Sequence, residues 1–596
     1  MISSEPLFFG PRARPRFGWL HRPQATSPSL GLVICNPFGY EAICAHRSLR
    51  HFADAAAAAG VPALRFDYDG TGDSAGSDRD PDRVASWIAS IHDAVETIRR
   101  RTGVARVCLM GVRLGALLAA RAAAERSDVA AFVALAPVVS GRAHVRELRV
   151  LQMSLGLVDP PPGRTAPDGE QEAVGFRITK ETREALSKID LAAGGVVPAR
   201  HVLVVDRDDL PVADAWAERL RGSGGCVDLR RLAGYTEMVL DPHKAKVPEQ
   251  IIAAVTGWLG EISATAATIA PPTETRPAGD VDWAEGPTGR IATDVGATVV
   301  ETAAYLDPNG TTFGILAAPD RAPGERAATK GILLLNAGAI HHVGPNRLYV
   351  NFARRWAAMG HVVLRIDVSG IGDSPPRNGE PENVVYTARA MEDVSAALAH
   401  LRQQGIAKTY VMGLCSGAYN AVRAAAAGQS IDGVVPINPL TFFWKDGMSL
   451  DYPSHRVVAD ARRYSNSIRS LDAWKKVLRG QVKLGPVAQV ALRDAAGRAV
   501  RHVRDAARAV GFPFAEDLGA DLGNIARRGA RIRFVFAADD PGAELLRVQG
   551  GSEVGRLRRK GALTTDVIYG PDHTFTPVWS HDVLGDCLTS ILESGK

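Results

Sequence analysis

Short apolar runs alternate with helical stretches along most of the chain. LGLVIC at 30–35 and GILLLN at 331–336 are apolar runs of strand length, and each precedes a stretch with the apolar spacing of a helix. Apolar runs of this kind are typical of strands buried on both faces, and their alternation with helices is typical of βαβ units. The pattern therefore predicts an α/β fold in which helices cover both faces of a mostly parallel sheet.

The second half of the chain repeats the first. FDYDGTGDS at 66–74 matches IDVSGIGDS at 366–374 at an offset of 300 residues, and GVRLGA at 111–116 matches GLCSGA at 413–418 at an offset of 302. Self-similarity over such a length is typical of a duplicated structural unit. The repeat predicts two tandem domains of the same fold.

The boundary between the two domains is predicted from composition. Residues 264–280 are rich in Pro, Thr and Ala and have no periodicity, which is typical of a linker. We therefore predict a first domain at 1–263, a linker at 264–290 and a second domain at 291–596. Division into domains also agrees with the length, because a chain of 596 residues is too long for one hydrophobic core.

Composition and charge exclude several classes of protein. The chain is 46% apolar and 23% charged, as in ordinary globular proteins, and its formal net charge is +5. The first twenty residues contain no apolar core of a signal peptide, and no uncharged run is long enough to span a bilayer. We expect a cytoplasmic protein without a membrane span. The six cysteines show neither disulfide-framework nor metal-ligand spacing, so no metal or redox cofactor is implied.

The stretch GLCSGA places Cys415 between Gly413 and Gly417, after an apolar strand and before an Ala-rich helix. In such a nucleophile elbow the small residues permit a sharp turn, which exposes the central side chain at the carboxyl edge of the sheet. Here the chain resembles the α/β-hydrolase superfamily and, more narrowly, the hydrolases associated with bacterial exosortase systems. The resemblance implies two tandem α/β-hydrolase folds, with Cys415 as the nucleophile of the second.

The superfamily orders its triad as nucleophile, acid and base along the chain, and the second half offers all three. The resemblance implies His573 as the base and Asp540 as the acid, with Asp539 as the alternative acid. The imidazole would accept the thiol proton, and the carboxylate would orient the imidazole. An oxyanion hole is implied from the backbone N–H groups of Ser416 and Gly338.

The first half has lost this chemistry. The same alignment places Arg113 at the apex, Asp209 at the position of the acid and Glu237 at the position of the base. Without a nucleophile or an imidazole, this half is predicted not to transfer acyl groups. Arg113, between Asp209 and Glu237, is expected either to form a buried ion-pair plug or to bind a carboxylate or phosphate.

Four further side chains near these motifs receive structural interpretations. His341 and His342 are expected to be loop or mouth residues rather than ligands. Asp73 and Asp373 lie in the two GDS loops, which are expected to face the site. Since they occur in both halves, including the one without a triad, we expect them to tie down a turn.

A basic insertion lies between the elbow and the acid of the second half. Residues 441–511 contain 14 Lys or Arg and 6 Asp or Glu, an excess of +8 that leaves −3 for the rest of the chain. Apolar residues at helical spacing predict amphipathic cap helices. The charge is either that of a solvated face or that of a surface steering an acidic acyl donor, such as coenzyme A or an acyl carrier protein. Nucleic acid is not indicated, because no known binding motif is present.

Together these features predict an enzyme that forms an acyl-Cys415 intermediate from an ester or thioester. A thioester intermediate retains much of the reactivity of the acyl group, which favours a thioesterase or an acyltransferase. The alternative is a non-catalytic binding or scaffolding protein of a biosynthetic or secretion assembly. The sequence does not identify the acyl group or its acceptor.

Overall fold

The computed structural model describes residues 3–24, 28–156, 160–161, 163, 169–193, 197–266, 282–321, 330–445, 448 and 516–594. The elements of the first half are β1 (Ser3–Pro11), β2 (Arg16–Arg22), β3 (Leu30–Cys35), α1 (Tyr40–Ala58), β4 (Ala63–Phe66), α2 (Arg83–Thr102), β5 (Arg106–Val112), α3 (Leu114–Ala124), β6 (Val129–Leu135), α4 (Gly141–Ser154), β7 (Gln171–Ala173), β8 (Phe176–Ile178), α5 (Lys180–Ser187), β9 (His201–Arg207), α6 (Asp214–Gly222), β10 (Cys226–Leu232), α7 (Tyr235–Met238) and α8 (Glu249–Ala266).

The elements of the second half are β11 (Trp283–Gly286), β12 (Thr288–Ala292), β13 (Thr298–Tyr305), β14 (Phe313–Pro319), β15 (Gly331–Leu335), η1 (Pro345–Arg347), α9 (Leu348–Ala358), β16 (Val362–Asp367), α10 (Ala390–Gln403), β17 (Thr409–Leu414), α11 (Ser416–Ala426), β18 (Gly433–Ile437), α15 (Leu518–Arg527), β19 (Arg531–Ala537), α16 (Gly542–Arg559), β20 (Leu563–Ile568) and α17 (Val578–Ser594).

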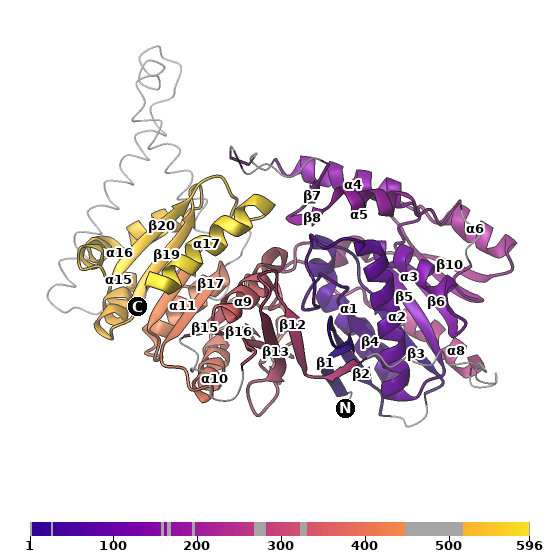
Figure 1. Cartoon of the computed structure of the whole chain (residues 1–596), viewed down its shortest axis with the longest axis horizontal. Coiled ribbons are helices and arrows are strands. Elements are labelled where there is room, and N and C mark those ends of the chain that lie inside the picture. Colours follow the sequence, from indigo (N-terminus) through magenta and orange to yellow (C-terminus); the bar gives the residue numbers. More distant parts are fainter. Residues whose placement is uncertain are drawn as a thin grey trace, which may run out of the picture.

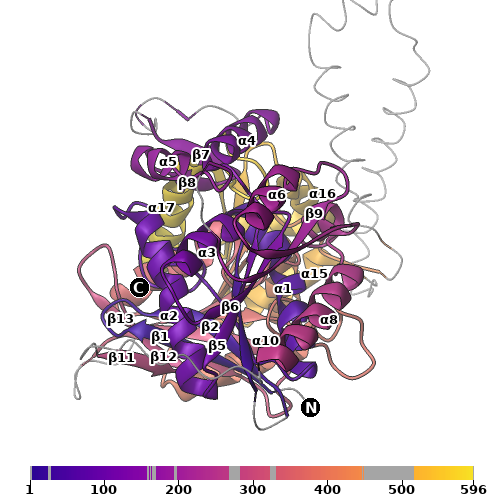
Figure 2. The same cartoon turned by 90° about the vertical axis from the view of Figure 1, so that its right-hand side faces the viewer.

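These elements form two nine-stranded sheets that lie side by side, each covered by helices (Figures 1 and 2). The strand order is β10-β9-β6-β5-β3-β4-β2-β1-β11 in the first sheet and β12-β13-β14-β16-β15-β17-β18-β19-β20 in the second. In each sheet, the strands that precede and follow the elbow run parallel, and the N-terminal strands pair antiparallel. The two tandem, mostly parallel α/β sheets predicted from the sequence are confirmed.

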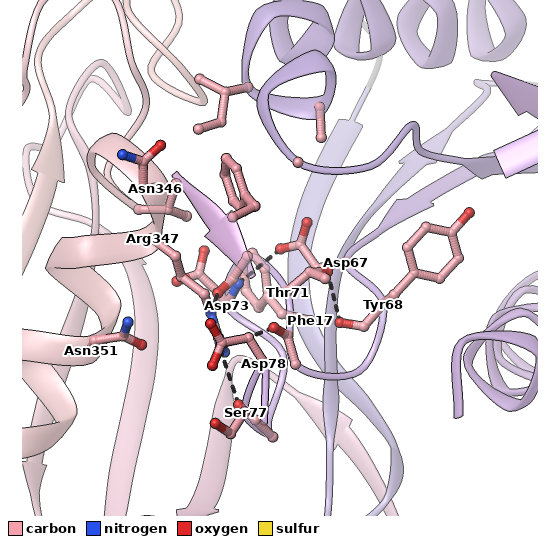
Figure 3. Close-up of a pocket in the computed structure, with 18 of the residues that line it drawn as sticks. Phe17, Asp67, Tyr68, Thr71, Asp73, Ser77, Asp78, Asn346, Arg347 and Asn351 are labelled. Atoms are coloured by element: carbon pink, nitrogen blue, oxygen red, sulfur yellow. Dashed lines mark hydrogen bonds between the residues drawn. The ribbon is translucent and has the colours of Figure 1, made fainter. Parts of the chain in front are cut away.

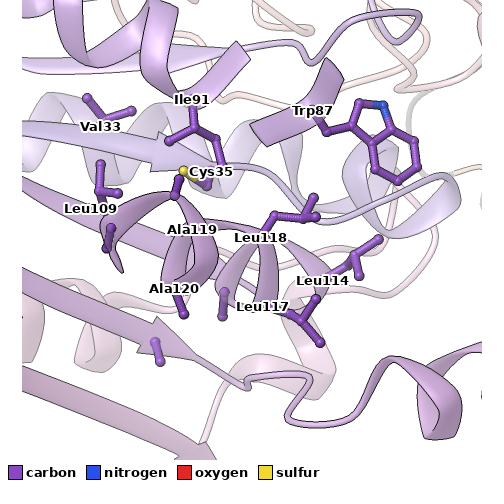
Figure 4. Packing of buried hydrophobic residues seen from close by; sticks show 14 of the residues in the cluster. Val33, Cys35, Trp87, Ile91, Leu109, Leu114, Leu117, Leu118, Ala119 and Ala120 are labelled. Atoms are coloured by element: carbon purple, nitrogen blue, oxygen red, sulfur yellow. The ribbon is translucent and has the colours of Figure 1, made fainter. Parts of the chain in front are cut away.

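The alternation of side chains along each buried strand explains why helices cover both faces. In β3, Leu32 and Ile34 pack with α1 and α8, whereas Val33 and Cys35 pack with α2 and α3 on the other face (Figure 4). Successive side chains of a strand point to opposite faces, so a continuous apolar run needs cover on both sides. Each fully buried aliphatic side chain contributes about 1.5–3 kcal/mol to this packing.

The predicted linker is structured where the structure describes it. Residues 264–266 end α8, and β11 (283–286) pairs antiparallel with β1 and so extends the first sheet. Directly after β11, the chain enters β12, which pairs with β13 in the second sheet. The sequence pattern did not predict β11. This strand forms because β1, which is distant in sequence, offers unpaired backbone groups with which β11 makes hydrogen bonds.

An apolar cluster joins the two halves at this crossing. Phe8, Phe17 and Trp19 of the first half belong to the same buried cluster as Phe313 of the second. The rings of Trp19 and Phe313 pack edge to face with centroids 4.8 Å apart. The two halves therefore share part of one hydrophobic core.

Two sequence predictions concern residues that the structure describes only in part. The cap at 441–511 lies almost entirely outside them and stays a prediction. Among the helices that the structure describes, none combines the length and apolar character needed to cross a bilayer.

Candidate active site

The chain turns sharply at Cys415. Strand β17 ends directly before this residue and α11 begins directly after it, and Cys415 itself has φ 59° and ψ −112°. A non-glycine residue adopts positive φ only where the surrounding structure enforces it. A Cβ atom on Gly413 would lie 2.5 Å from the backbone of Gly417, and one on Gly417 would lie 2.6 Å from the carbonyl oxygen of Leu335. Only glycine fits at both positions, as the elbow motif requires.

His573 and Asp540 come together at the carboxyl ends of β20 and β19. The distance from His573 Nδ1 to Asp540 Oδ2 is 2.5 Å, and the Asp540 side chain is only 1% exposed. Its other oxygen accepts the N–H of Gly542 at 2.8 Å. Asp539 is exposed, so the geometry selects Asp540, rather than its neighbour, as the partner of the imidazole.

The thiol of Cys415 lies beside the other nitrogen of this imidazole. Burial lowers the pKa of His573, but the negative charge of the Cys415 thiolate and the hydrogen bond with Asp540 outweigh burial and raise this pKa to about 10. The Nε2 atom of His573 is buried and has no aligned hydrogen-bond partner among the described residues. The site can therefore hold an imidazolium next to the Cys415 side chain at neutral pH.

A tyrosine that sequence analysis missed completes the surroundings of the thiol. The hydroxyl of Tyr386 is buried, and no described residue meets it with the geometry of a hydrogen bond. Burial, together with the adjacent Cys415, raises the pKa of Tyr386 well above its ordinary value. Its ring stacks on Trp444 at 4.2 Å and meets Tyr419 edge-on at 5.1 Å. Tyr386 lies between β16 and α10 without a motif around it, so no sequence signal marks it.

Asn438 fastens the loop that carries the imidazole. Its Nδ2 donates to the carbonyl of His573 at 2.7 Å, and its Oδ1 accepts the N–H of Ala537 at 2.8 Å. This asparagine thereby links the His573 loop to the end of β19, three residues before Asp540. The first half has Ala136 at the matching position, with the same positive φ but no amide. An alignment of the two halves shows this difference, so the sequence did contain a signal for Asn438.

The oxyanion hole differs from the prediction. The N–H of Gly338 donates to the hydroxyl of Ser416 at 2.8 Å, and this hydroxyl donates in turn to the carbonyl of Asn336 at 3.1 Å. The Gly338 N–H is therefore not free to bind an oxyanion, because it already donates to Ser416, a side chain to which the motif assigned no such role. The backbone N–H of Ser416 lies in the first turn of α11, where no intrahelical acceptor exists, and remains a candidate donor. The Ser416 hydroxyl is buried and makes two hydrogen bonds, so it is not placed to act as the nucleophile.

The elbow of the first half has the same backbone shape around a different side chain. Arg113 has φ 53° and ψ −120°, close to the values at Cys415. Its guanidinium donates to Glu41 at 2.9 Å and to Glu147 at 2.6 Å, and Tyr235 donates to the same Glu41 oxygen at 3.0 Å. Arg113 is buried and Glu41 half-buried, while Glu147 is exposed, so this arrangement is an ion-pair triad around a buried guanidinium.

The carboxylates predicted for this triad are wrong. Asp209 is paired with Arg207 at the surface, and Glu237 is paired with Lys246 at the surface. The long guanidinium of Arg113 instead reaches carboxylates on α1 and α4. Alignment with the second half could not find these, because the residue at that elbow, Cys415, is too short to reach the equivalent helices.

The GDS loops do not face the active site, and their aspartates do not tie down the turn. Asp67 accepts the N–H of Asp73 at 3.0 Å and Ser74 donates to the Asp67 carbonyl at 2.6 Å, so Asp67 and Ser74 hold this turn. Asp367 and Ser374 repeat both contacts. The carboxylates of Asp73 and Asp373 are thus left to reach across to the opposite half.

A cavity of about 430 Å³ lies between the two halves. Figure 3 shows part of its lining, with Asp73 on the loop of the first half and Arg347 of the second half close to it. Cys415, His573 and Asp540 do not line this cavity. The triad, rather than this cavity, therefore locates the candidate chemistry. His341 and His342, which the sequence places at a loop or mouth, are buried at this boundary between the halves.

Two segments of the chain match a family model described as "Serine aminopeptidase, S33". The matched residues are 44–173 and 327–471. Each segment contains the elbow of its half, and the second ends before Asp540 and His573.

Several solved structures resemble one half of the chain. Est1E from Butyrivibrio proteoclasticus, solved with ferulic acid bound, is 20% identical over 43% of this chain and 99% of its own, with a TM-score of 0.35. The hypothetical protein PA2218 from Pseudomonas aeruginosa is 17% identical over 43% of this chain and 94% of its own, with a TM-score of 0.31. The esterase Pf2001 from Pyrococcus furiosus is 14% identical over 44% and 93%, with a TM-score of 0.31.

A comparison with curated proteins finds no match. The family match in both segments and the common strand order of the two sheets support the α/β-hydrolase superfamily for both halves of the chain.

Proposed function

We propose that the second half is a cysteine-dependent acyl-transfer enzyme with Cys415 as nucleophile, His573 as base and Asp540 as acid. One observation carries the proposal. Among the described residues, the His573 Nε2 atom is buried without an aligned hydrogen-bond partner, the imidazole interacts with the thiol at the elbow, and a buried carboxylate binds Nδ1. This arrangement is what nucleophilic catalysis by a thiolate requires.

The reaction follows from these roles. The Cys415 thiolate attacks the acyl carbon of an ester or thioester, and the bond to the leaving oxygen or sulfur breaks as His573 delivers a proton to it. The acyl-Cys415 thioester is then attacked by water or by an acceptor hydroxyl or amine, from which His573 removes a proton. The products are the acylated acceptor, or the free acid, and the regenerated thiolate. The enzyme is thus a thioesterase or an acyltransferase.

The proposal gives the two halves different roles. The family match supports ester hydrolysis in general, and the cysteine at the elbow of the second half favours thioester chemistry. The first half has a buried arginine at its elbow and is proposed to be non-catalytic. The basic insertion at 441–511 favours coenzyme A or an acyl carrier protein as the acyl donor.

Incubation with acyl thioesters is expected to add one acyl group to Cys415, because a thioester intermediate lies on the proposed path. Intact-mass measurement and peptide mapping would detect it. The variant Cys415→Ala should carry no acyl group, whereas Cys587→Ala, which removes another partly exposed thiol, should be acylated normally. Acylation that survives in Cys415→Ala would contradict the proposal.

The substitution Tyr386→Phe is expected to slow acylation of Cys415 by about 10²- to 10³-fold, the effect of losing one oxyanion donor. We propose this role because the Tyr386 hydroxyl is buried beside Cys415 and has no aligned hydrogen-bond partner among the described residues, whereas the N–H of Gly338 is occupied by Ser416. The rate constant of acylation should fall more than the apparent substrate affinity. Tyr419→Phe alters a ring of the same aromatic cluster and should leave the rate nearly unchanged. Equal losses in the two variants would contradict the role of the hydroxyl.

A further inference from the structure

The two halves are joined by a reciprocal pair of buried ion pairs. Arg65 of the first half donates to Asp373 of the second at 2.5 Å, and Arg365 of the second half donates to Asp73 of the first at 2.5 Å. All four side chains are buried, and each pair of equivalent residues is 300 positions apart in the sequence. Two equivalent surfaces that exchange identical contacts are the mark of a two-fold interface. The duplicated domains therefore pack like the subunits of a symmetric dimer.

Histidines break this symmetry. The second oxygen of Asp73 binds His342 Nε2 at 2.7 Å, while His342 Nδ1 binds Asp367 at 2.7 Å. On the opposite side, Asp373 is bound by His46, which lies on α1 of the first half. The ring of His46 also stacks on His341 at 3.8 Å. Both histidines of the second half are thus held by side chains of the first.

These histidines belong to the loop that adjoins the nucleophile. Loop 336–344 connects β15 to η1, and its Asn336 donates to Asp367 at 2.7 Å and to the carbonyl of Ile340 at 2.9 Å. Gly338 of the same loop donates to Ser416, the residue after Cys415. A continuous chain of hydrogen bonds therefore runs from Asp73 of the first half, through His342 and the loop, to the elbow.

The network fixes the charge of His342. Burial lowers the pKa of His342, but the carboxylates of Asp367 and Asp73 outweigh burial and raise it to about 10. The spacing of His342, Asp367 and Asp373 would suit a metal ion, yet both His342 nitrogens are engaged by carboxylates. The charged and titratable groups that face His342 are Asp367, Asp373 and His341 of the second half and Asp73 of the first. Behind them, Arg365 binds Asp73 and His46 binds Asp373.

We infer that the first half is a positioning subunit for the second, in which Asp73 holds His342 and thereby fixes loop 336–344 beside Cys415. The inference rests on the proposed function of Cys415 and explains what a half without a nucleophile contributes. Asp73 is a positioning residue, since it touches neither the thiol nor a substrate. A displacement of about 1 Å in groups beside a reacting atom can slow a reaction by about 10²-fold.

Two reactions of Cys415 separate positioning from thiolate formation. Iodoacetamide alkylates a thiolate without an oxyanion hole, whereas acylation by a thioester depends on the groups around the carbonyl oxygen. In Asp73→Asn we expect acylation to slow by about tenfold or more while site-resolved alkylation of Cys415 keeps its wild-type rate. Since the His342 imidazolium loses one carboxylate, the variant-to-wild-type ratio of acylation rates should fall further as pH rises from about 7 to 9.

Asp373→Asn is the matched control. It removes the equivalent buried carboxylate, which is bound by Arg65 and His46 rather than by a nitrogen of His342. Acylation should change less in this variant, because Asp373 reaches loop 336–344 mainly through the ring contact between His46 and His341, and hydrogen exchange of the loop should accelerate more in Asp73→Asn than in Asp373→Asn. Equal slowing of acylation in both variants, or unchanged exchange of the loop in Asp73→Asn, would overturn the inference.

Two further measurements cover the cases in which Asp73→Asn does not fold or the wild type is not acylated. If Asp73→Asn does not fold, His342→Gln breaks the same contact from the other side, and normal acylation in that variant would overturn the inference. If the wild type forms no acyl-Cys415, the proposed function fails, while hydrogen exchange of the loop still decides whether Asp73 positions it.

Discussion

In His573→Ala, acylation of Cys415 is expected to be about 10²- to 10⁴-fold slower than in the wild type, the range for loss of a general base. The imidazole is the group beside the thiol that can take its proton, and Asp540 holds this imidazole through Nδ1. Single-turnover kinetics with a chromogenic thioester would measure the rate of acyl-enzyme formation. A wild-type rate in this variant would show that His573 does not serve the thiol.

The pH dependence of alkylation tests the same pair independently. The pKa of His573 is raised to about 10 by the Cys415 thiolate and Asp540, so the imidazolium persists across neutral pH. The ratio of the wild-type to the His573→Ala alkylation rate at Cys415 should therefore be highest near neutral pH and fall as the pH approaches about 10, where His573 loses its charge. A ratio near one at neutral pH would show that the imidazolium does not act on the thiol.

Two adjacent aspartates provide a matched control for the acid. Asp540→Asn should slow acylation by up to about 10⁴-fold, because the amide would stabilise the wrong tautomer of the imidazole. Asp539→Asn changes an exposed neighbour and should leave the rate unchanged. The reverse order of effects would show that the acid was assigned to the wrong residue.

The second large effect concerns stability. Arg113→Ala is expected to destabilise the folded chain by about 3 kcal/mol, the lower end of the range for breaking a buried ion pair, since Glu147 is 48% exposed and can be solvated. Loss of the guanidinium should destabilise the chain more through Glu41 than through Glu147, because one Glu41 oxygen is buried without a hydrogen bond from the described residues. Urea unfolding followed by circular dichroism would measure the change.

The compensated variant distinguishes a plug from an anion site. Arg113→Met combined with Glu41→Gln removes both charges and should recover part of the lost stability, because a buried pair can be replaced by neutral groups. Folded Arg113→Ala should still acylate Cys415. Unchanged stability together with lost affinity for a carboxylate or phosphate ligand would favour the anion site instead.

Much of the fold and part of the candidate site follow from local pattern. The alternation of apolar runs and helices predicts the sheets, and the repeat at an offset of about 300 predicts two domains. The glycines around Cys415 predict its elbow, because a sharp turn brings residues 413 and 417 too close together for a side chain at residue 413, although the approach of Gly417 to Leu335 is visible only in the folded chain. The position of the triad along the chain comes from resemblance, and the choice of Asp540 over Asp539 agrees with burial in the folded chain.

Other contacts could be decided only by packing. The partners of Arg113 lie 72 and 34 residues away on separate helices, and Tyr386 and Asn438 meet the site from loops without a motif. The repeated GDS sequence shows that Asp73 and Asp373 matter in both halves, but not that each carboxylate binds an arginine of the other half. Those arginines are 292 and 308 residues away.

The sequence alone thus determined the buried parallel strands around each elbow and the residue at each apex, because apolar patterns and glycine spacing are local, whereas β11 depends on pairing with the distant β1. Tertiary structure decided which charges pair, because Coulomb energy and hydrogen bonding depend on distance in space. Those distances exist only once the two domains have packed against each other.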